Sequence, residues 1–149
     1  MNKQHDCFYC IKNQQLHDLM IEVYSNDIST LYLNKDQTHK GRCIVALNEH
    51  KNELFELSDD ELKQFMKSIS NAARAIKEIF HADKINYAIY GDLVSHLHFH
   101  LVPKYKGKKE WGEAFINSPE FKVKEKEEIM KERVYKLRNY YEKMTNGSK

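Results

Sequence analysis

The stretch SHLHFHLVPKY, residues 95–105, constrains the fold more than any other feature, because it holds His96, His98 and His100 at alternate positions. Alternate side chains of a β-strand point to the same face, so the three imidazoles are expected to share one face. The residues between and after them are apolar: Leu97, Phe99 and Leu101. The pattern therefore predicts a strand that packs on the core with one face and carries histidines on the other.

Three histidines in line are poorly placed to bind one metal ion. Neighbouring members are about 6.5–7 Å apart along a strand and the outer two about 13 Å, whereas zinc binds nitrogens at about 2.0–2.1 Å. We therefore expect the histidines to have different roles. A neutral imidazole can attack through one nitrogen while a partner holds the proton of the other, and a cationic neighbour can stabilise a phosphate. This combination is typical of nucleotidyl or phosphoryl transfer through a covalent histidine intermediate.

The composition of the chain indicates one soluble globular domain spanning residues 1–149, with 41% hydrophobic and 31% charged residues. A formal net charge of +2 gives no reason to expect a nucleic acid duplex or a membrane surface as partner. No apolar run approaches the roughly 20 residues of a spanning helix, and the first ten residues, MNKQHDCFYC, lack the apolar core of a signal peptide. We expect a cytoplasmic protein.

The expected order of elements is strands, helix, strands, helix, which predicts an antiparallel α+β domain. Residues 20–26 and 28–34 are rich in β-branched and aromatic residues and predict a hairpin, and a short apolar strand follows over residues 43–47. Two further strands are expected over residues 85–90 and 97–102.

Two helices are expected. Ser58 and Glu61 have the spacing of a capping box, and the helix after them ends near His81. Its apolar face comprises Leu62, Phe65, Met66, Ile69, Ala73, Ile76 and Phe80. A last helix is expected to begin at Ser118-Pro119 and to reach about residue 144. Its apolar stripe comprises Met130, Val134, Leu137 and Tyr141, for which packing within the chain is favoured over a partner helix.

The run from His96 to Val102, HLHFHLV, resembles the signature of the histidine triad (HIT) family, and NKDQTHKGRCIVALNEH (residues 34–50) resembles the family's upstream block. The resemblance covers roughly residues 7–105. It implies a HIT-like fold, with an antiparallel sheet of about five strands and one main helix packed on it. The C-terminal helix lies outside the resemblance. It also implies a homodimer whose two sheets join edge to edge.

The resemblance further implies an enzyme that cleaves nucleoside monophosphate–X substrates at the α-phosphate. His98 would be the nucleophile, His100 would contact the α-phosphate, and Asn34 would lie near the nucleotide. Residues 31–33 would line the base or ribose pocket. A dinucleoside polyphosphate of the diadenosine tetraphosphate type is the favoured substrate. A purine nucleoside phosphoramidate hydrolase and a regulatory module that binds nucleotides without turnover are the alternatives.

Asp92 departs from the family pattern, because many members have glutamine or asparagine four residues before the first histidine. A carboxylate only accepts hydrogen bonds and repels phosphate. Asp92 would therefore turn away to hold a histidine, be protonated, or face a cationic or amine-like leaving group. Ser95 would replace the serine that the family often has at the position of Leu93.

Cys7 and Cys10 form a C-x-x-C motif, which alone is compatible with half of a zinc site, a redox pair or chance. The resemblance to one subset of the family adds His50 and His96 as ligands, with His5 as an alternative fourth ligand. Such a Cys2His2 site would be closed and therefore structural. His96 would be either a ligand or part of the catalytic hydrogen-bond network, and no catalytic cofactor would be required. The alternative hypothesis is a metal-dependent hydrolase, in which two triad histidines bind a catalytic metal ion.

The remaining candidates have simpler interpretations. Cys43 is expected to be a buried small hydrophobe. His17, His39 and His81 are expected at the surface, with an approach of His39 to the phosphates as the alternative. The lysines after the triad strand would lie in a solvated loop or receive the leaving group: Lys104, Lys106, Lys108 and Lys109.

Overall fold

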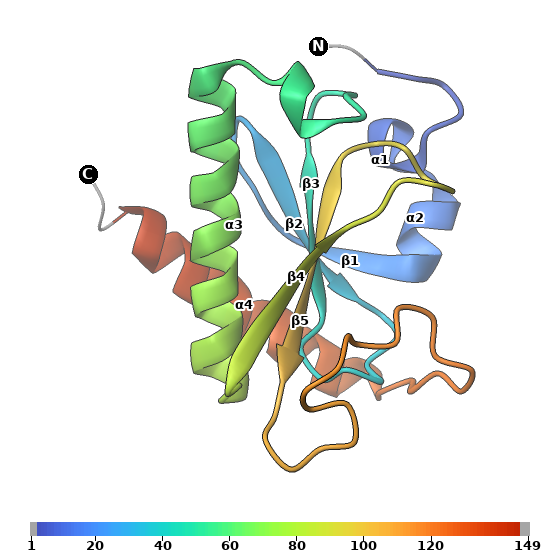
Figure 1. Cartoon of the computed structure of the whole chain (residues 1–149), viewed down its shortest axis with the longest axis vertical. Coiled ribbons are helices and arrows are strands. Elements are labelled where there is room, and N and C mark those ends of the chain that lie inside the picture. The colour runs from blue at the N-terminus through green and yellow to red at the C-terminus, as the bar shows by residue number, and fades with distance from the viewer. Residues whose placement is uncertain (1–2, 147–149) are drawn as a thin grey trace.

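The fold is one five-stranded antiparallel sheet with helices on both faces, seen in a computed structural model that describes residues 3–146, with side chains to residue 144 (Figure 1). The strands are β1 (Met20–Ser25), β2 (Ser29–Asn34), β3 (Cys43–Leu47), β4 (Lys84–Ile89) and β5 (His98–Lys104). They are arranged β1-β2-β3-β5-β4. The helices are α1 (Phe8–Ile11), α2 (Gln14–Leu19), α3 (Asp59–Phe80) and α4 (Glu127–Asn146), with a 3₁₀ turn at Leu54–Glu56. The predicted α+β architecture is confirmed.

Side-chain alternation divides the sheet into two apolar layers. Cys43, Val45 and Leu47 of β3 belong to the main core beneath α3 and α4, whereas Ile44 and Ala46 belong to a second cluster beneath α1 and α2. Figure 1 shows these two pairs of helices on opposite sides of the sheet. In β5, Phe99 and Leu101 enter the main core, and the intervening histidines therefore point to the other face.

The predicted hairpin over β1 and β2 is confirmed. Asn26 stabilises its turn, because its side-chain oxygen accepts hydrogen bonds from the backbone N–H groups of Ile28 and Ser29, at 3.0 and 2.9 Å. Met20 is paired with Asn34, so the hairpin register places Asn34 at the end of β2, opposite the start of β1.

Helix α3 begins and ends as predicted. The Ser58 hydroxyl accepts the Glu61 N–H at 3.1 Å, the Glu61 carboxylate accepts the Ser58 N–H at 2.9 Å, and His81 ends the helix in a left-handed conformation. The predicted apolar face is wrong at Met66, which is 38% exposed. Ala72 and Ala75 are buried instead, because the 3.6-residue period places them, and not Met66, over the sheet.

Helix α4 begins at Glu127, so the predicted start at Ser118-Pro119 is wrong. The C-terminal segment (residues 105–126) is held in an irregular conformation by contacts with distant residues that outweigh its local helix signals. Arg42 donates to the backbone oxygen of Asn117 at 2.8 Å, and the Asp36 carboxylate accepts the Val123 N–H at 3.0 Å.

The apolar stripe of α4 packs within the chain, which confirms the favoured interpretation. All four members, Met130, Val134, Leu137 and Tyr141, are buried in the main core. The ring of Tyr141 lies 4.7 Å from that of Tyr24, and its hydroxyl donates to the backbone oxygen of Ser68 at 3.3 Å. The sequence did not predict α1 and α2, which are only one to two turns long.

Candidate active site and metal centre

The three triad histidines have three different environments. His96 lies just before β5, and its Nε2 is 2.6 Å from the backbone oxygen of Leu47. A carbonyl oxygen only accepts, so Nε2 carries the proton and the Nδ1 lone pair points the other way, towards Cys7 and Cys10. Burial lowers the pKa of His96 to about 4. Its ring is therefore neutral at neutral pH, which ligation of a metal ion requires.

His98 is held with its Nδ1 proton on the backbone oxygen of His96, at 2.6 Å. The Nε2 nitrogen therefore carries the free lone pair of the neutral ring. Burial lowers the pKa of His98 as well, which keeps the ring neutral and nucleophilic at neutral pH. The ring of Tyr9 lies 5.1 Å away and that of His100 5.0 Å away, and the side chain is 6% exposed. His98 thus presents one fixed, unprotonated nitrogen.

His100 has the opposite tautomer. Its Nδ1 lies 3.0 Å from an Nη2 nitrogen of Arg42, and a guanidinium only donates, so Nδ1 accepts and Nε2 carries the proton. Burial first, and then electrostatic interaction with His98 and Arg42, lowers the pKa of His100 to about 3. His100 is therefore a neutral Nε2–H donor. The sequence reasoning missed Arg42, which carried no motif signal beyond its place between Gly41 and a buried strand.

Four residues could hold a metal ion: Cys7, Cys10, His50 and His96, whose ligand atoms all lie within 4.8 Å of one another. Cys10 Sγ is 3.4 Å from His50 Nδ1 and 3.5 Å from His96 Nδ1. Cys7 Sγ is 3.3 Å from His96 Nδ1, and the two Nδ1 atoms are 3.2 Å apart. This is the set that the sequence predicted. The alternative ligand His5 is exposed and lies outside it.

A cavity of about 1070 Å³ lies in front of His98 and His100. Arg42 and Asn34 also line it, and so do residues from both ends of the chain: Phe8, Tyr9, Asn117, Ser118, Lys122 and Lys124. The walls of the cavity therefore include segments that precede the first strand and segments that follow the last strand in the sequence.

The sequence model of the HIT domain matches residues 19–107. The chain belongs to the HIT family. An uncharacterized HIT-like protein of Methanocaldococcus jannaschii is 27% identical over 114 residues, which cover 74% of this chain and 85% of that protein. The adenosine 5'-monophosphoramidase of Schizosaccharomyces pombe is 28% identical over 85 residues, which cover 56% of this chain and 64% of the yeast enzyme.

Solved HIT structures share the fold. A histidine triad protein from Bradyrhizobium japonicum superposes with a TM-score of 0.77 at 23% identity, covering 87% of this chain and 96% of that one. A zinc-bound histidine triad family protein from Mycobacterium smegmatis has a TM-score of 0.68 at 22% identity, covering 95% and 97%. The predicted family and fold are confirmed.

The predicted nucleotide-binding residues of this HIT protein are not all in one place. Asn34 lines the triad cavity, and its buried Oδ1 has no hydrogen-bond partner among the described residues. Asp92 is exposed between the triad cavity and a smaller one, and within residues 3–146 its carboxylate makes no hydrogen bond to a histidine. Ser95 lines only the smaller cavity, of about 560 Å³.

Two of the three residues expected to line the base or ribose pocket, residues 31–33, do not face the histidines. Leu31 and Leu33 are buried in the main core, and only Tyr32 points to the face of the histidines. Of the four loop lysines, Lys104 is buried, with its Nζ on the Glu113 backbone oxygen at 2.6 Å, and the other three are exposed. None of the four lines the triad cavity.

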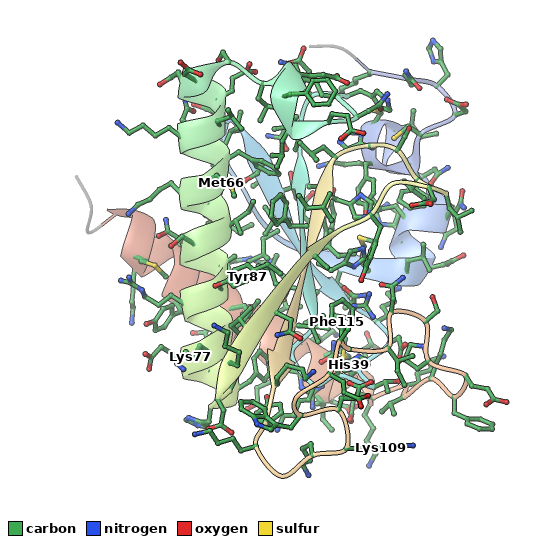
Figure 2. The ribbon with its side chains drawn as sticks, in the orientation of Figure 1. His39, Met66, Lys77, Tyr87, Lys109 and Phe115 are labelled. Carbon is green, nitrogen blue, oxygen red and sulfur yellow. The ribbon has the colours of Figure 1, made fainter. Side chains whose placement is uncertain are left out.

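His39 is not a surface residue as predicted, whereas His17 and His81 are exposed. Its Nε2 lies 2.8 Å from the Glu110 carboxylate, and its ring lies 5.8 Å from that of Phe115, in edge-to-face contact (Figure 2). His39 thus connects the loop before β3 to the C-terminal segment and does not line the triad cavity.

Proposed function

We propose that this HIT protein is a nucleotide hydrolase or transferase that acts on nucleoside monophosphate–X substrates. The observation that carries the proposal is the fixed, neutral His98, whose Nε2 lone pair is available while Nδ1 donates to the His96 backbone oxygen. An imidazole held in one tautomer is an activated nucleophile that needs no separate base.

In the proposed reaction, Nε2 of His98 attacks the α-phosphorus and the bond from phosphorus to X breaks. The nucleotidyl-histidine is then cleaved by water, or its nucleotidyl group passes to another acceptor, and His98 is restored. The 2.6 Å hydrogen bond from Nδ1 to the His96 oxygen stabilises the positive charge that the ring gains in the intermediate. His100 donates its Nε2–H to a phosphate oxygen.

The cavity favours a nucleotide. The buried Oδ1 of Asn34 needs a donor and suits a ribose hydroxyl, and Phe8 and Tyr9 supply aromatic surface. A dinucleoside polyphosphate is our leading substrate class. A purine nucleoside phosphoramidate is the second, favoured by two observations: the similarity to the yeast adenosine 5'-monophosphoramidase and the carboxylate of Asp92, which suits a cationic or amine-like leaving group.

We further propose that zinc occupies the Cys7, Cys10, His50 and His96 site. A tetrahedral zinc with two sulfur and two nitrogen ligands separates its ligand atoms by about 3.3–3.8 Å. Four of the six distances between ligand atoms are 3.2–3.5 Å, close to this range, and all four atoms lie within 4.8 Å of one another. The Leu47 carbonyl oxygen accepts a hydrogen bond from His96 Nε2 and so orients the ring with Nδ1 towards the site. Zinc bound there would join the N-terminal residues to β5, which is a structural role.

A cytoplasmic homodimer completes the proposal. Strand β4 is at the edge of the sheet, and its Tyr87 and Ile89 are 53% and 37% exposed. Such an edge favours pairing with a second copy. No helix among residues 3–146 is both long enough and apolar enough to span a bilayer. A monomeric mass in sedimentation equilibrium would contradict the dimer.

The test is release of AMP from diadenosine tetraphosphate and, separately, from adenosine phosphoramidate. His98→Ala should abolish release while the protein stays folded and still binds AMP, and His17→Ala, which changes an exposed histidine outside the cavity, should act like the wild type. The faster substrate identifies the leaving-group class. AMP binding without turnover of either substrate would favour a regulatory module instead, and loss of folding in His98→Ala would remove the assignment of His98.

A further inference from the structure

Among the described residues, Arg42 is a buried cation without an acidic partner. It precedes β3 and is 5% exposed, and within residues 3–146 no carboxylate forms an ion pair with it. Its guanidinium donates from Nη1 to the backbone oxygen of Asn117 and from Nη2 to the Asn117 side-chain oxygen, both at 2.8 Å. It lies 5.3 Å from the centre of the Phe115 ring. All these partners are neutral.

The carboxylate with the largest electrostatic effect on Arg42 is that of Asp36, but Asp36 is engaged elsewhere. Its Oδ1 accepts hydrogen bonds from the Thr38 hydroxyl and backbone N–H and from the Val123 N–H. A charge removed from water is costly unless it is paired. Arg42 lines the triad cavity together with His98, and its buried Nε has no hydrogen-bond partner among the described residues. An anion in the cavity would supply the missing charge.

We propose that Arg42 supplies the positive charge of the phosphate subsite and holds His100 as a neutral hydrogen-bond donor to that phosphate. This inference rests on the proposed function. The contact of 3.0 Å between Arg42 Nη2 and His100 Nδ1 leaves the His100 proton on Nε2, where it can reach a ligand. His100 then needs no charge of its own, because the guanidinium beside it is permanently charged.

Asn117 positions the guanidinium, and it belongs to the C-terminal segment. The HIT domain match ends at residue 107, so Asn117 lies outside it. The side-chain and backbone oxygens of Asn117 together accept from both terminal nitrogens, which fixes the plane of the guanidinium. The phosphate subsite is therefore completed by a part of the chain that follows the HIT domain.

The test compares the affinities of AMP and adenosine, measured by titration calorimetry, for the wild type and Arg42→Gln. Adenosine lacks the phosphate, so the ratio of the two dissociation constants isolates the phosphate subsite. We expect Arg42→Gln to reduce the preference for AMP roughly 10- to 100-fold, the usual effect of a hydrogen bond to a charged group. Arg138→Gln is the matched control, because Arg138 donates to the Val23 backbone oxygen and does not line the cavity.

A merely structural role would give a different result. Loosening the C-terminal segment would weaken AMP and adenosine alike and leave their ratio unchanged, and that result in folded Arg42→Gln would overturn the proposal. Arg42→Lys keeps the charge and should retain more of the AMP preference than Arg42→Gln, and an equal loss in both would also overturn it. Nitrogen NMR of wild-type His100 provides a test that needs no variant, because a proton on Nδ1 contradicts the geometry proposed here.

Inorganic pyrophosphate separates failure of this inference from failure of the proposed function. If the wild type releases AMP from substrate and the ratio is unchanged in Arg42→Gln, only the role of Arg42 is wrong. If the wild type binds neither AMP nor adenosine, the nucleotide function is wrong. Binding of pyrophosphate to the wild type but not to Arg42→Gln would still support the anion subsite, and pyrophosphate binding unaffected by the substitution would overturn it.

Discussion

Cys10→Ser should remove the metal and lower stability without abolishing the chemical step. Cys10 Sγ lies within 3.5 Å of the Nδ1 atoms of both His50 and His96, so its loss removes the ligand between them. Serine is a poor zinc ligand at neutral pH, because its hydroxyl stays protonated. Without a metal, burial raises the pKa of the remaining Cys7 thiol, which disfavours the thiolate that ligation needs.

The size of the effect follows from linkage. A ligand present at about 1,000 times its dissociation constant stabilises the folded state by about 4 kcal/mol. A chain of 149 residues has an unfolding entropy of about 0.3 kcal/mol/K near 60 °C. Losing the metal should therefore lower Tm by about 13 °C. Cys43→Ala is the control, because Cys43 is a fully buried thiol outside the metal site.

Three quantities are measured for the wild type and for Cys10→Ser: metal content by mass spectrometry, Tm by calorimetry, and kcat. The temperature for kcat is well below the Tm of either protein. In Cys10→Ser we expect less than one zinc per chain, the lower Tm, and a kcat reduced less than about tenfold. The small loss is expected because the His96 oxygen that holds His98 is still fixed by the bond from His96 Nε2 to Leu47. A kcat reduced by 100-fold or more in folded protein would refute the structural role and favour the metal-dependent hydrolase. An unchanged Tm and metal content would remove the zinc site.

Three further predictions follow from burial. Because burial lowers the pKa of His98 below its usual value near 6.5, kcat/KM should stay level as the pH falls from 8 to 6.5 and decline only below that, and a midpoint at or above 6.5 would contradict a buried neutral nucleophile. His100, with its pKa of about 3, contributes stability that is complete above pH 6.5 and is lost as the pH falls towards 3, so the wild type should lose more stability than His100→Gln over that range in urea unfolding. Leu137 of α4 is 0% exposed, so Leu137→Ala should cost about 2–5 kcal/mol in urea unfolding. Tyr135→Ala on the same helix, 64% exposed, should cost less than about 0.5 kcal/mol, and equal effects would show that α4 does not pack on the core.

The parts of the fold that could be predicted are those with a local signal. The alternation in HLHFHLV, the capping box at Ser58 and the apolar run Cys43–Leu47 each depend on residues a few positions apart, and each element has the expected bounds or lies within two residues of them. The ligand set Cys7, Cys10, His50 and His96 joins three separate segments and came from family resemblance, because spacing alone identifies only the C-x-x-C half.

The parts that could not be predicted depend on long-range contacts. The start of α4 was misplaced because Ser118-Pro119 has good helix-start chemistry, while the contacts that prevent a helix come from Asp36 and Arg42. Arg42 and Asn117 are 75 residues apart. Arg42 lies in the upstream block at a position to which the sequence assigned no role, and Asn117 belongs to no motif. Met66 was misassigned for a related reason, since an apolar residue at the margin of a helix face is buried only if a neighbouring element covers it.

These long-range contacts bear on where substrate selectivity resides. The residues of the proposed chemical step, His98 and His100, lie within the matched HIT domain, whereas the walls of the cavity include Phe8 and Tyr9 before it and residues 117–124 after it. Relatives that share only the domain can therefore share the nucleophile without sharing the pocket that surrounds the leaving group. The yeast phosphoramidase is matched over 85 residues, 56% of this chain, so the similarity does not extend over the whole span from Phe8 to Lys124 that lines the cavity. The leaving-group preference of this protein should accordingly respond to substitutions in residues 117–124, while the need for His98 should not.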